Sequence, residues 1–494
     1  MIKTSIMTTE KTRLVAVSNR LPIILKKVNN RWHIESGSGG LVTALAPVLR
    51  NRGGLWIGWP GTTEKTRLQP LLDEASVKTG YKLIPVPISP EEAENYYLGY
   101  ANSVIWPLFH DLQSKCEFRP RYWYTYMEVN RRFARTIAAN TSEKDYIWIH
   151  DYHLVHVGKL LKELKTPRKS GFFLHIPFPP LDVFVRLPWR VQLLEALMEY
   201  NMVGFQTMRD RKNFLHCLVR YFPETRIQGR GSVVEVHFQD RMVRVGNFPI
   251  SIDFSHFEKI ALSSEVNSRA QSLRDRFHGQ KIILGVDRLD YTKGIQERLE
   301  GFHNALLRYP ELISKVTLIQ VLVPSRRELV EYKNLKARID RLIAEINGQF
   351  ATLDWDPIHY HYRSLELEEL VTLYRAADIA LITPLKDGMN LVAKEYCACS
   401  VDNKGVLILS EFAGTAADLQ KGAILVNPHD YEAIADAVHQ AVNMDQRERY
   451  SRMKTMRSII RKRDIFSWVD SFLGAAFAVN LKDFPEIEEY VPGL

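Results

Sequence analysis

Short runs of β-branched and aromatic residues recur along the chain, and they constrain its fold more than any other feature. The runs are LVAVS at 14–18, YIWI at 146–149, GFFL at 171–174, MVGF at 202–205, IILGV at 282–286, VTLIQVLV at 316–323, IALIT at 379–383 and VLILS at 406–410. Uninterrupted apolar runs suit strands buried on both faces, as in parallel sheets. Helical patterns such as LEELVTLYRAAD lie between many of them. This alternation predicts βαβ units and an α/β fold.

The length of the chain predicts two domains. It has 494 residues, whereas a single hydrophobic core stops growing at roughly 250 to 300 residues. At 247–259, in NFPISIDFSHFEK, an apolar strand gives way to Pro, Ser and Asp ahead of a charged helical segment. We place the linker there, and we predict a first domain over 1–250 and a second over 251–465.

The charge of the chain argues against nucleic acid as a partner. Lys and Arg outnumber Asp and Glu by 66 to 57, which gives a formal charge of +9. A solvated basic surface explains this mild excess, and a cleft for anionic substrates is the sharper alternative. The basic residues are spread along the chain, whereas nucleic-acid binding favours a stripe or an arm.

The cysteines and the apolar content point to the cytoplasm. Cys116, Cys217, Cys397 and Cys399 show no CxxC spacing, so free thiols in a reducing compartment are expected. The start, MIKTSIMTTEKTR, lacks the apolar core of a secretory signal. No run of about 18 apolar residues is present to span a membrane. We therefore expect a cytoplasmic protein with no membrane partner.

Chemically capable side chains cluster at the ends of the predicted strands. Ligands of open parallel sheets bind beyond the carboxyl ends of the strands. The residues at such ends are Arg20, Asp151, His175, Arg288, Arg326 and Asp387. Two sheets facing each other across a cleft would bring these groups together.

The motif VDRLDYTKG at 286–294 places two cations in one loop after a strand. Arg288 and Lys293 could stabilise the charge that develops on a diphosphate leaving group. The alternative is a surface ion pair of either cation with Asp287 or Asp290.

The motif KDGMNLVAKEY at 386–396 reads as a loop that enters a helix. The amides of Met389, Asn390, Leu391 and Val392 would be unpaired first-turn donors for phosphate or sugar oxygens. Glu395 could accept from ribose hydroxyls and Asp387 from a sugar. The alternative is an N-capping Asp387 with a solvated Glu395.

Two further motifs carry candidate binding residues. In SGSGGLVTAL at 36–45, Gly39 and Gly40 would let backbone amides approach a phosphate or sugar, although a plain glycine turn explains them equally well. In IHDYH and FFLHIPFP, Asp151 would hold acceptor hydroxyls and His175 would donate to a donor sugar, with a satisfied core histidine as the alternative for His175. A metal site is disfavoured, because no HExxH or DxD-type pattern flanks these residues.

With these motifs in place, the sequence resembles the trehalose-6-phosphate synthases. The resemblance runs from about 13 to 475, and its motifs are VSNRLP, SGSGGLVTAL, GGLWIGWPG, YYLGYANSVIWPLFH, IWIHDYHL, GFFLHIPFP, VDRLDYTKG, PSRREL, TPLKDGMNLVAKEY and SEFAG. The family consists of retaining glycosyltransferases with two Rossmann-like domains that face a central cleft, the GT-B arrangement. The resemblance implies transfer of glucose from UDP-glucose to glucose 6-phosphate, which gives trehalose 6-phosphate and UDP.

The resemblance also implies a role for each candidate residue. The phosphate of glucose 6-phosphate would be held by Arg20, Tyr97, Trp106 and Arg326, and the acceptor hydroxyls by Asp151. The UDP diphosphate would be bound by Arg288 and Lys293. The rest of UDP-glucose would be contacted by Gly39, Gly40, His175, Leu365, Asp387, Gly388, Met389, Asn390, Leu391, Val392 and Glu395. Of these residues, Asp151, His175, Arg288 and Lys293 would act most directly on the reaction.

Several properties of the family extend this expectation. It uses no metal or other cofactor, and the favoured mechanism is front-side attack, in which the departing phosphate takes the acceptor proton. No pair of carboxylates of the kind that retaining hydrolases use is evident here. Ser251 stands where the family commonly has glycine, and the helix at about 466–494 would return to the first domain. The chain ends at Leu494 without the phosphatase-like domain of some relatives, so the product should stay phosphorylated.

Other functions are weighed beside this one. A glucosylglycerol-phosphate synthase, or another transferase with a different phosphorylated acceptor, is the nearest alternative. A catalytically silent sugar-phosphate sensor is an alternative from another class. The sequence does not select an oligomeric state, and a homodimer or homotetramer would each be compatible with it. The use of ADP- or GDP-glucose is likewise not decided.

Overall fold

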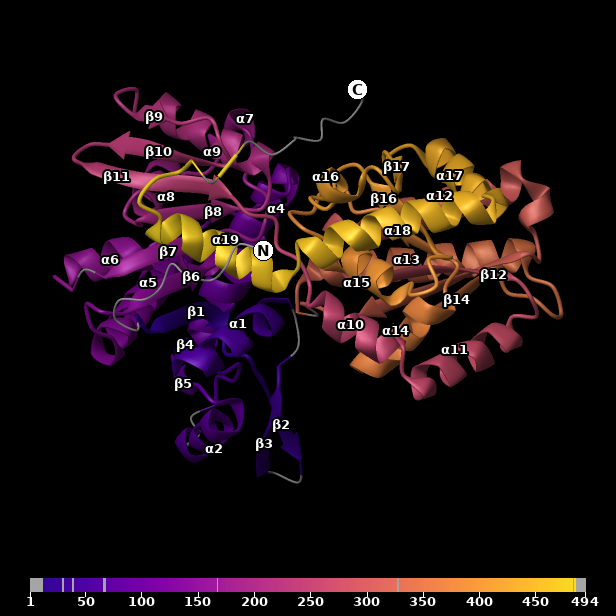
Figure 1. Ribbon diagram of the computed structural model, residues 1–494, viewed down its shortest axis with the longest axis horizontal. Coiled ribbons are helices and arrows are strands. Elements are labelled where there is room, and N and C mark those ends of the chain that lie inside the picture. Colours follow the sequence, from indigo (N-terminus) through magenta and orange to yellow (C-terminus); the bar gives the residue numbers. More distant parts are fainter. Residues whose placement is uncertain are drawn as a thin grey trace. The chain divides into compact units, whose positions relative to one another are not determined.

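The computed structural model describes residues 12–28, 31–37, 40–64, 68–166, 168–326, 328–482 and 484–485. The chain divides into two compact units (Figure 1). The first contains the described residues up to Ile250 together with the segment that begins at Ile465, and the second runs from Ser251 to Asp464. No described helix combines the length and the apolar character that crossing a bilayer requires.

The first unit is built on a sheet that, within the described residues, has nine strands. Their order is β5-β4-β1-β6-β7-β8-β11-β10-β9. Their bounds are β1 Leu14–Arg20, β4 Leu55–Trp59, β5 Lys82–Pro85, β6 Tyr146–His150, β7 Lys169–Phe173, β8 Met202–Phe205, β9 Arg226–Gln228, β10 Val233–Phe238 and β11 Arg241–Asn247. The strands from β5 to β11 in this order pair in parallel, whereas β10 and β9 add antiparallel strands at one edge. A separate hairpin pairs β2, Ile23–Val28, with β3, Arg31–Ser36.

The helices of the first unit connect and cover these strands. They are α1 Gly40–Arg52, α2 Gln69–Thr79, α3 Pro90–Glu92, η1 Ala93–Ile105, α4 Trp106–Phe109, η2 Gln113–Lys115, α5 Pro120–Asn140, η3 Tyr152–Leu154, α6 Val157–Glu163, α7 Leu181–Phe184, α8 Arg190–Leu197, α9 Met208–Tyr221 and α19 Ile465–Phe477. Segment η1 is π-helical along its 13 residues. Such segments are rare and occur often at functional sites.

The second unit is an open parallel sheet covered by helices on both faces. The strands, in the order β14-β13-β12-β15-β16-β17, are β12 Lys281–Arg288, β13 Val316–Val323, β14 Ile358–Tyr362, β15 Ile379–Ile382, β16 Val406–Ser410 and β17 Ile424–Val426. The helices are α10 Phe254–Ala261, α11 Ser264–Arg276, η4 Tyr291–Lys293, α12 Ile295–Arg308, η5 Pro310–Leu312, α13 Val330–Phe350, α14 Leu367–Ala376, α15 Leu391–Cys399, α16 Ala416–Leu419, α17 Tyr431–Asn443 and α18 Gln446–Lys462.

Alternate side chains of this second sheet enter two different cores. Ile282 and Leu284 of β12 pack with residues of α10, α14, α15 and α18. Ile283, which lies between them in the sequence, packs with residues of α12, α13 and α17. This burial on both faces explains why the strands read as continuous apolar runs. The predicted α/β class is confirmed, and each predicted strand run forms a strand, although β7 and β15 end one residue before GFFL and IALIT do.

Helix α19 completes the core of the first unit. Its Trp468 and Phe472 rings stack on the Trp148 ring of β6, with centroids 5.0 and 4.3 Å away. Glycines make room for Phe472 on the neighbouring strands, because a Cβ added at Gly171 or Gly204 would lie 2.9 or 2.8 Å from its ring. Phe472 is fully buried. The last described helix is therefore an integral part of the first unit.

Replacing Phe472 with alanine should destabilise the first unit. We expect Phe472→Ala to lower the free energy of unfolding by about 3 to 5 kcal/mol, the usual effect of removing a fully buried phenylalanine ring. Urea denaturation followed by tryptophan fluorescence measures the change. The matched control is Phe466→Ala on the same helix, where the side chain is 37% exposed; its effect should stay below about 1 kcal/mol. Equal effects of the two substitutions would contradict the packing of α19.

Candidate functional site

Both sheets contain a switch point, where successive strands start to be added on the opposite side of the first strand. In the first unit it lies between β1 and β6, and in the second between β12 and β15. Ligands of open α/β sheets bind beyond the carboxyl ends of the strands at such points. Arg20 ends β1, Asp151 follows β6, Arg288 ends β12, and Asp387 follows β15. The sequence motifs therefore fall at the two places where this architecture binds ligands.

In the second unit an ion pair joins the two loops that leave the switch point. The Nζ atom of Lys293 lies 2.6 Å from Oδ2 of Asp387, and their side chains are only 13% and 8% exposed. The amide of Leu385 also donates to the carbonyl of Thr292 at 2.9 Å. Gly294 follows Lys293 with φ +60°, and a Cβ there would lie 1.9 Å from the carbonyl oxygen of Thr383. The loops are thus packed backbone to backbone, and Lys293 pairs with Asp387 instead of Asp287 or Asp290.

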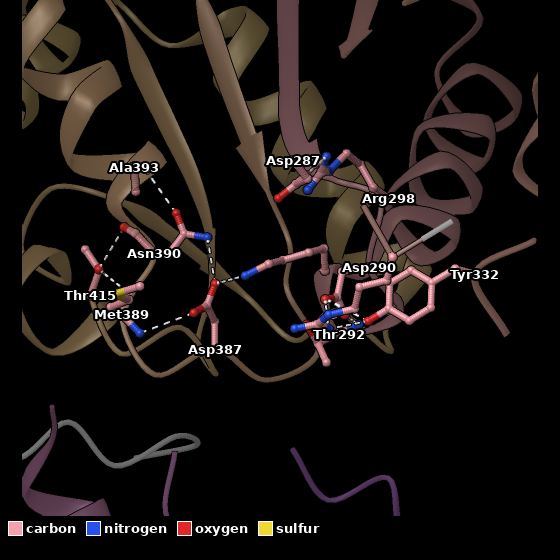
Figure 2. Close-up of polar contacts among 12 residues, drawn as sticks. Asp287, Asp290, Thr292, Arg298, Tyr332, Asp387, Met389, Asn390, Ala393 and Thr415 are labelled. Atoms are coloured by element: carbon pink, nitrogen blue, oxygen red, sulfur yellow. Dashed lines mark hydrogen bonds and ion pairs between the residues drawn. The ribbon is translucent and has the colours of Figure 1, made fainter. Parts of the chain in front are cut away.

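Figure 2 shows how the loop before α15 is organised around Asp387. Its Oδ1 accepts from the amide of Met389 at 3.2 Å, and its Oδ2 accepts from the side chain of Asn390 at 3.3 Å. Asn390, with φ 72°, is the N-cap of α15 and accepts from the amide of Ala393 at 3.1 Å. The alternative of an N-capping Asp387 is therefore wrong, and the amide of Met389 is already paired. Leu391 and Val392 form the first turn, where helix amides have no acceptor four residues back.

Glu395 lies one turn further along α15. Its Oε2 accepts from the hydroxyl of Tyr374 on α14 at 2.8 Å. Burial raises the pKa of Glu395 above its usual value. Glu395 is thus partly buried, and its carboxyl is held by a neighbouring helix. Leu365, just before α14, is partly buried and packs on the adjacent core.

Two buried carboxylates near the end of β12 have different partners. Asp287 pairs with the fully buried Arg298 at 2.6 Å, and burial raises the pKa of Asp287. Asp290 accepts from Arg326 at 3.1 Å. Burial acts to raise the pKa of Asp290 too, but the charges of Arg326, Arg288 and Lys293 outweigh it and hold the pKa below its usual value.

In the first unit, Arg20 and Tyr97 lie in one aromatic cluster. The Arg20 guanidinium lies over the Trp59 ring at 4.1 Å and is 5.9 Å from the Tyr97 ring centroid. Tyr97, from η1, stacks on His153 with centroids 5.9 Å apart. Trp106 is buried and contacts Tyr152, whose ring centroid lies 4.0 Å from that of His153. The structure thus connects Arg20, Tyr97 and Trp106 through neighbouring rings.

Asp151 has a strained backbone at the end of β6. Its φ is 76°, a region that residues other than glycine rarely adopt and that is often associated with function. Its amide donates to the carbonyl of Phe173 at 2.8 Å, and its Oδ1 accepts from the amide of His175 at 3.3 Å. These contacts hold the partly exposed carboxylate beside the ends of β6 and β7.

His175 belongs to a directional chain of buried hydrogen bonds. The amide of Ile250 donates to Oε1 of Gln206 at 2.9 Å, which leaves the Gln206 Nε2 group to donate to Nδ1 of His175 at 3.2 Å. The Nε2 atom of His175 therefore carries the proton and donates to Nδ1 of His150 at 3.2 Å. These are the contacts of the core-histidine alternative, and a role of His175 toward the donor sugar stays a prediction.

The remaining predicted residues are placed as follows. Gly39 lies outside the described residues, and Gly40 begins α1. Arg326, with φ 44°, follows β13 in the second unit, so its predicted phosphate site together with Arg20 stays a prediction. Among the described residues, no group of three or more His, Cys, Asp or Glu side chains is arranged to hold a metal ion. The sequence did not predict Gln206, which donates to His175, or Tyr332, which contacts Arg326 and Asp290. Nothing in the local pattern marks either residue, and Asp290 was considered only as an ion-pair partner.

Three comparisons with known proteins agree with one another. Glycosyltransferase family 20 matches residues 12–477. A trehalose-6-phosphate synthase of Mycolicibacterium vanbaalenii is 41% identical over 467 residues, or 93% of this chain and 95% of that protein. A solved protein from E. coli bound with UDP-2-fluoro glucose has a TM-score of 0.85 at 33% identity, with 95% and 100% of the two chains covered. An alpha,alpha-trehalose-phosphate synthase (UDP-forming) from Burkholderia xenovorans in complex with glucose-6-phosphate has a TM-score of 0.84 at 31% identity, with 94% and 99% covered.

Acid should destabilise the first unit, because its buried histidines are neutral. Burial lowers the pKa of His156 and of His175 to about 3. Burial, together with the nearby His175 ring, also lowers the pKa of His150. Unfolded histidine titrates near 6.5, so between about pH 6.5 and 3 the unfolded chain binds more protons and stability falls as pH falls. Each such histidine contributes a slope of about 1.4 kcal/mol per pH unit.

The urea midpoint at pH 7, 6 and 5 tests this expectation. It should fall steadily below pH 6.5, and His156→Gln should make the decline shallower. A midpoint that is the same at pH 7 and pH 5 would contradict the neutral, buried state of these rings.

Proposed function

The chain belongs to glycosyltransferase family 20, and we propose that it transfers glucose from UDP-glucose to glucose 6-phosphate, which forms trehalose 6-phosphate and UDP. The observation that carries this proposal is the buried contact of Lys293 with Asp387 at the switch point of the second sheet. A parallel sheet of this strand order binds nucleotides at that point. The similarity to UDP-forming synthases over nearly the whole chain supports the choice of donor and acceptor.

For the donor, we assign the diphosphate to Arg288 and Lys293. Arg288 ends β12, and Lys293 lies in the short loop that follows, where Asp387 already orders it. Charges that are fixed before the reaction stabilise developing negative charge without having to reorganise. The diphosphate would compete with Asp387 for Lys293, which leaves the Asp387 carboxylate available to the glucose hydroxyls.

The first turn of α15 completes the proposed donor site. The amides of Leu391 and Val392, at the positive end of the helix, suit phosphate or sugar oxygens. Gly388 and Met389 lie in the loop that Asp387 organises. Glu395, oriented by Tyr374, is assigned to the ribose hydroxyls, and Leu365 to the side of the uracil.

For the acceptor, we assign the phosphate of glucose 6-phosphate to Arg20, Tyr97, Trp106 and Arg326. The Trp59 ring holds the Arg20 guanidinium in place, and arginine binds phosphate through two parallel hydrogen bonds. Asp151 would orient the acceptor hydroxyls, and its strained backbone fits a residue whose position is functionally constrained.

We further propose that the transfer needs no metal and retains the anomeric configuration. The charges of Arg288 and Lys293, together with the helix end, would neutralise the leaving diphosphate. Front-side attack would let this diphosphate accept the proton of the acceptor hydroxyl. The cytoplasm is the proposed location, since the four cysteines are free thiols.

Removing the Lys293 charge should abolish most of the activity. We expect Lys293→Ala to lower kcat at least about a hundredfold, as the loss of one preorganised charge contact typically does. A UDP-release assay at saturating substrates measures the change. Lys336→Ala is the matched control, because Lys336 also forms an ion pair, with Asp340 on α13, but away from the switch point. Near-normal turnover of Lys293→Ala would refute the role of Lys293.

A competition between acceptors tests the substrate. With UDP-glucose and EDTA, and with glucose 6-phosphate and glycerol 3-phosphate offered together, the product should be trehalose 6-phosphate. Mass spectrometry identifies the product, and the EDTA should not slow UDP release. Exclusive use of glycerol 3-phosphate would overturn the acceptor assignment, and loss of activity in EDTA that added Mg²⁺ restores would overturn metal independence.

A further inference from the structure

Among the charged residues of VDRLDYTKG, all of which the structure describes, Asp290 is the one whose side chain is completely buried. In the sequence it lies between Arg288 and Lys293. Its side chain is 0% exposed, so neither carboxylate oxygen reaches solvent. A buried carboxylate is strongly unfavourable unless hydrogen bonds and opposite charge compensate it. Its partners therefore indicate what it is for.

The two carboxylate oxygens of Asp290 hold two different loops (Figure 2). Oδ1 accepts from the amide and the hydroxyl of Thr292, at 3.1 and 3.0 Å, in the loop that carries Lys293. Oδ2 accepts from Nη1 of Arg326 and from the hydroxyl of Tyr332, both at 3.1 Å. Each oxygen thus fixes a separate segment, one after β12 and one after β13.

Arg326 and Tyr332 form a closed arrangement with this carboxylate. Arg326 donates to the Tyr332 hydroxyl as well as to Asp290. Burial, with the charge of Asp290, raises the pKa of Tyr332 far above its usual value, so the hydroxyl stays protonated and can donate. The guanidinium of Arg326, a side chain that is 5% exposed, is therefore held by both Asp290 and Tyr332.

We propose that Asp290 is a positioning residue that couples the two phosphate sites. Through one carboxylate oxygen it positions the loop of Lys293, which binds the donor diphosphate, and through the other it positions Arg326, which binds the acceptor phosphate. This inference rests on the proposed function for the roles of Lys293 and Arg326. A shift of the carboxylate toward one loop weakens its contacts with the other loop. Binding of one substrate therefore changes the affinity for the other.

Asp290→Asn is the first test. The amide has only one acceptor oxygen, so it cannot serve Thr292 and the Arg326–Tyr332 pair at the same time. We expect the KM of UDP-glucose and the KM of glucose 6-phosphate both to rise by about fivefold or more, with kcat lower as well. Asp287→Asn is the matched control, because it removes a carboxylate that is also buried and ion-paired, three residues earlier in the same motif and at the end of β12. It should lower the Tm while changing both KM values by less than about threefold.

A double-mutant cycle gives the second test and needs only mild substitutions. Thr292→Val removes one donor at Oδ1, and Tyr332→Phe removes one donor at Oδ2. If Asp290 couples the loops, the loss of kcat/KM in the double variant should be smaller than the product of the single losses by at least about threefold. Losses that multiply within error would overturn the coupling, even if Asp290→Asn fails to fold.

The outcomes separate this inference from the proposed function. A wild-type protein that releases no UDP from UDP-glucose with glucose 6-phosphate overturns both. A wild-type protein that turns over normally, with an Asp290→Asn variant in which only one KM changes, overturns the positioning role of Asp290 alone. Rises in both KM values, together with the non-multiplicative cycle, support it.

Discussion

The second unit is organised around the divergence of β12 and β15 at the switch point of its sheet. Two adjacent parallel strands send their connections to opposite faces, which leaves a gap at their carboxyl ends that side chains from both loops must fill. Here Lys293 and Asp387 fill it with an ion pair, and the carbonyl of Thr383 leaves no room for a side chain at position 294. The positions of Asn390, Met389 and the start of α15 follow from Asp387, so this one contact organises the candidate donor site.

The buried carboxylates near this gap show how surroundings decide the state of chemically identical groups. Asp287 has two cations nearby, Arg298 and Lys293, but burial dominates and the charge of Asp387 adds to it, so the pKa of Asp287 is raised. Asp290 has a comparable degree of burial but lies near three cations, and its pKa is lowered. The difference arises from the balance of the surrounding charges and hydrogen bonds and not from depth. Glu395 accepts a hydrogen bond from the neutral Tyr374, and burial raises its pKa as it does that of Asp287.

Much of the fold could be predicted from the sequence, because strands buried on both faces produce uninterrupted apolar runs. The β2–β3 hairpin and the antiparallel strands β9 and β10 give no such runs, since their side chains alternate between core and solvent or are exposed throughout. The loops that carry Lys293 and Asp387 were also predictable, because they follow strands. The contacts within them were not: Asn390 instead of Asp387 caps α15, and the partners of His175 come from residues 25 and 31 positions away in the chain. Such pairings depend on how the strands are ordered, which a local pattern does not contain.

The place of α19 in the first unit has a consequence for biosynthesis. Trp468 and Phe472 cover the Trp148 ring of β6, but they leave the ribosome only after the whole second unit, Ser251–Asp464, has been made. At about 5–20 residues per second, this interval lasts on the order of ten to forty seconds. During translation the Trp148 ring therefore lacks the cover of α19, and transiently exposed apolar surface of this kind is what chaperones shield until a chain is complete.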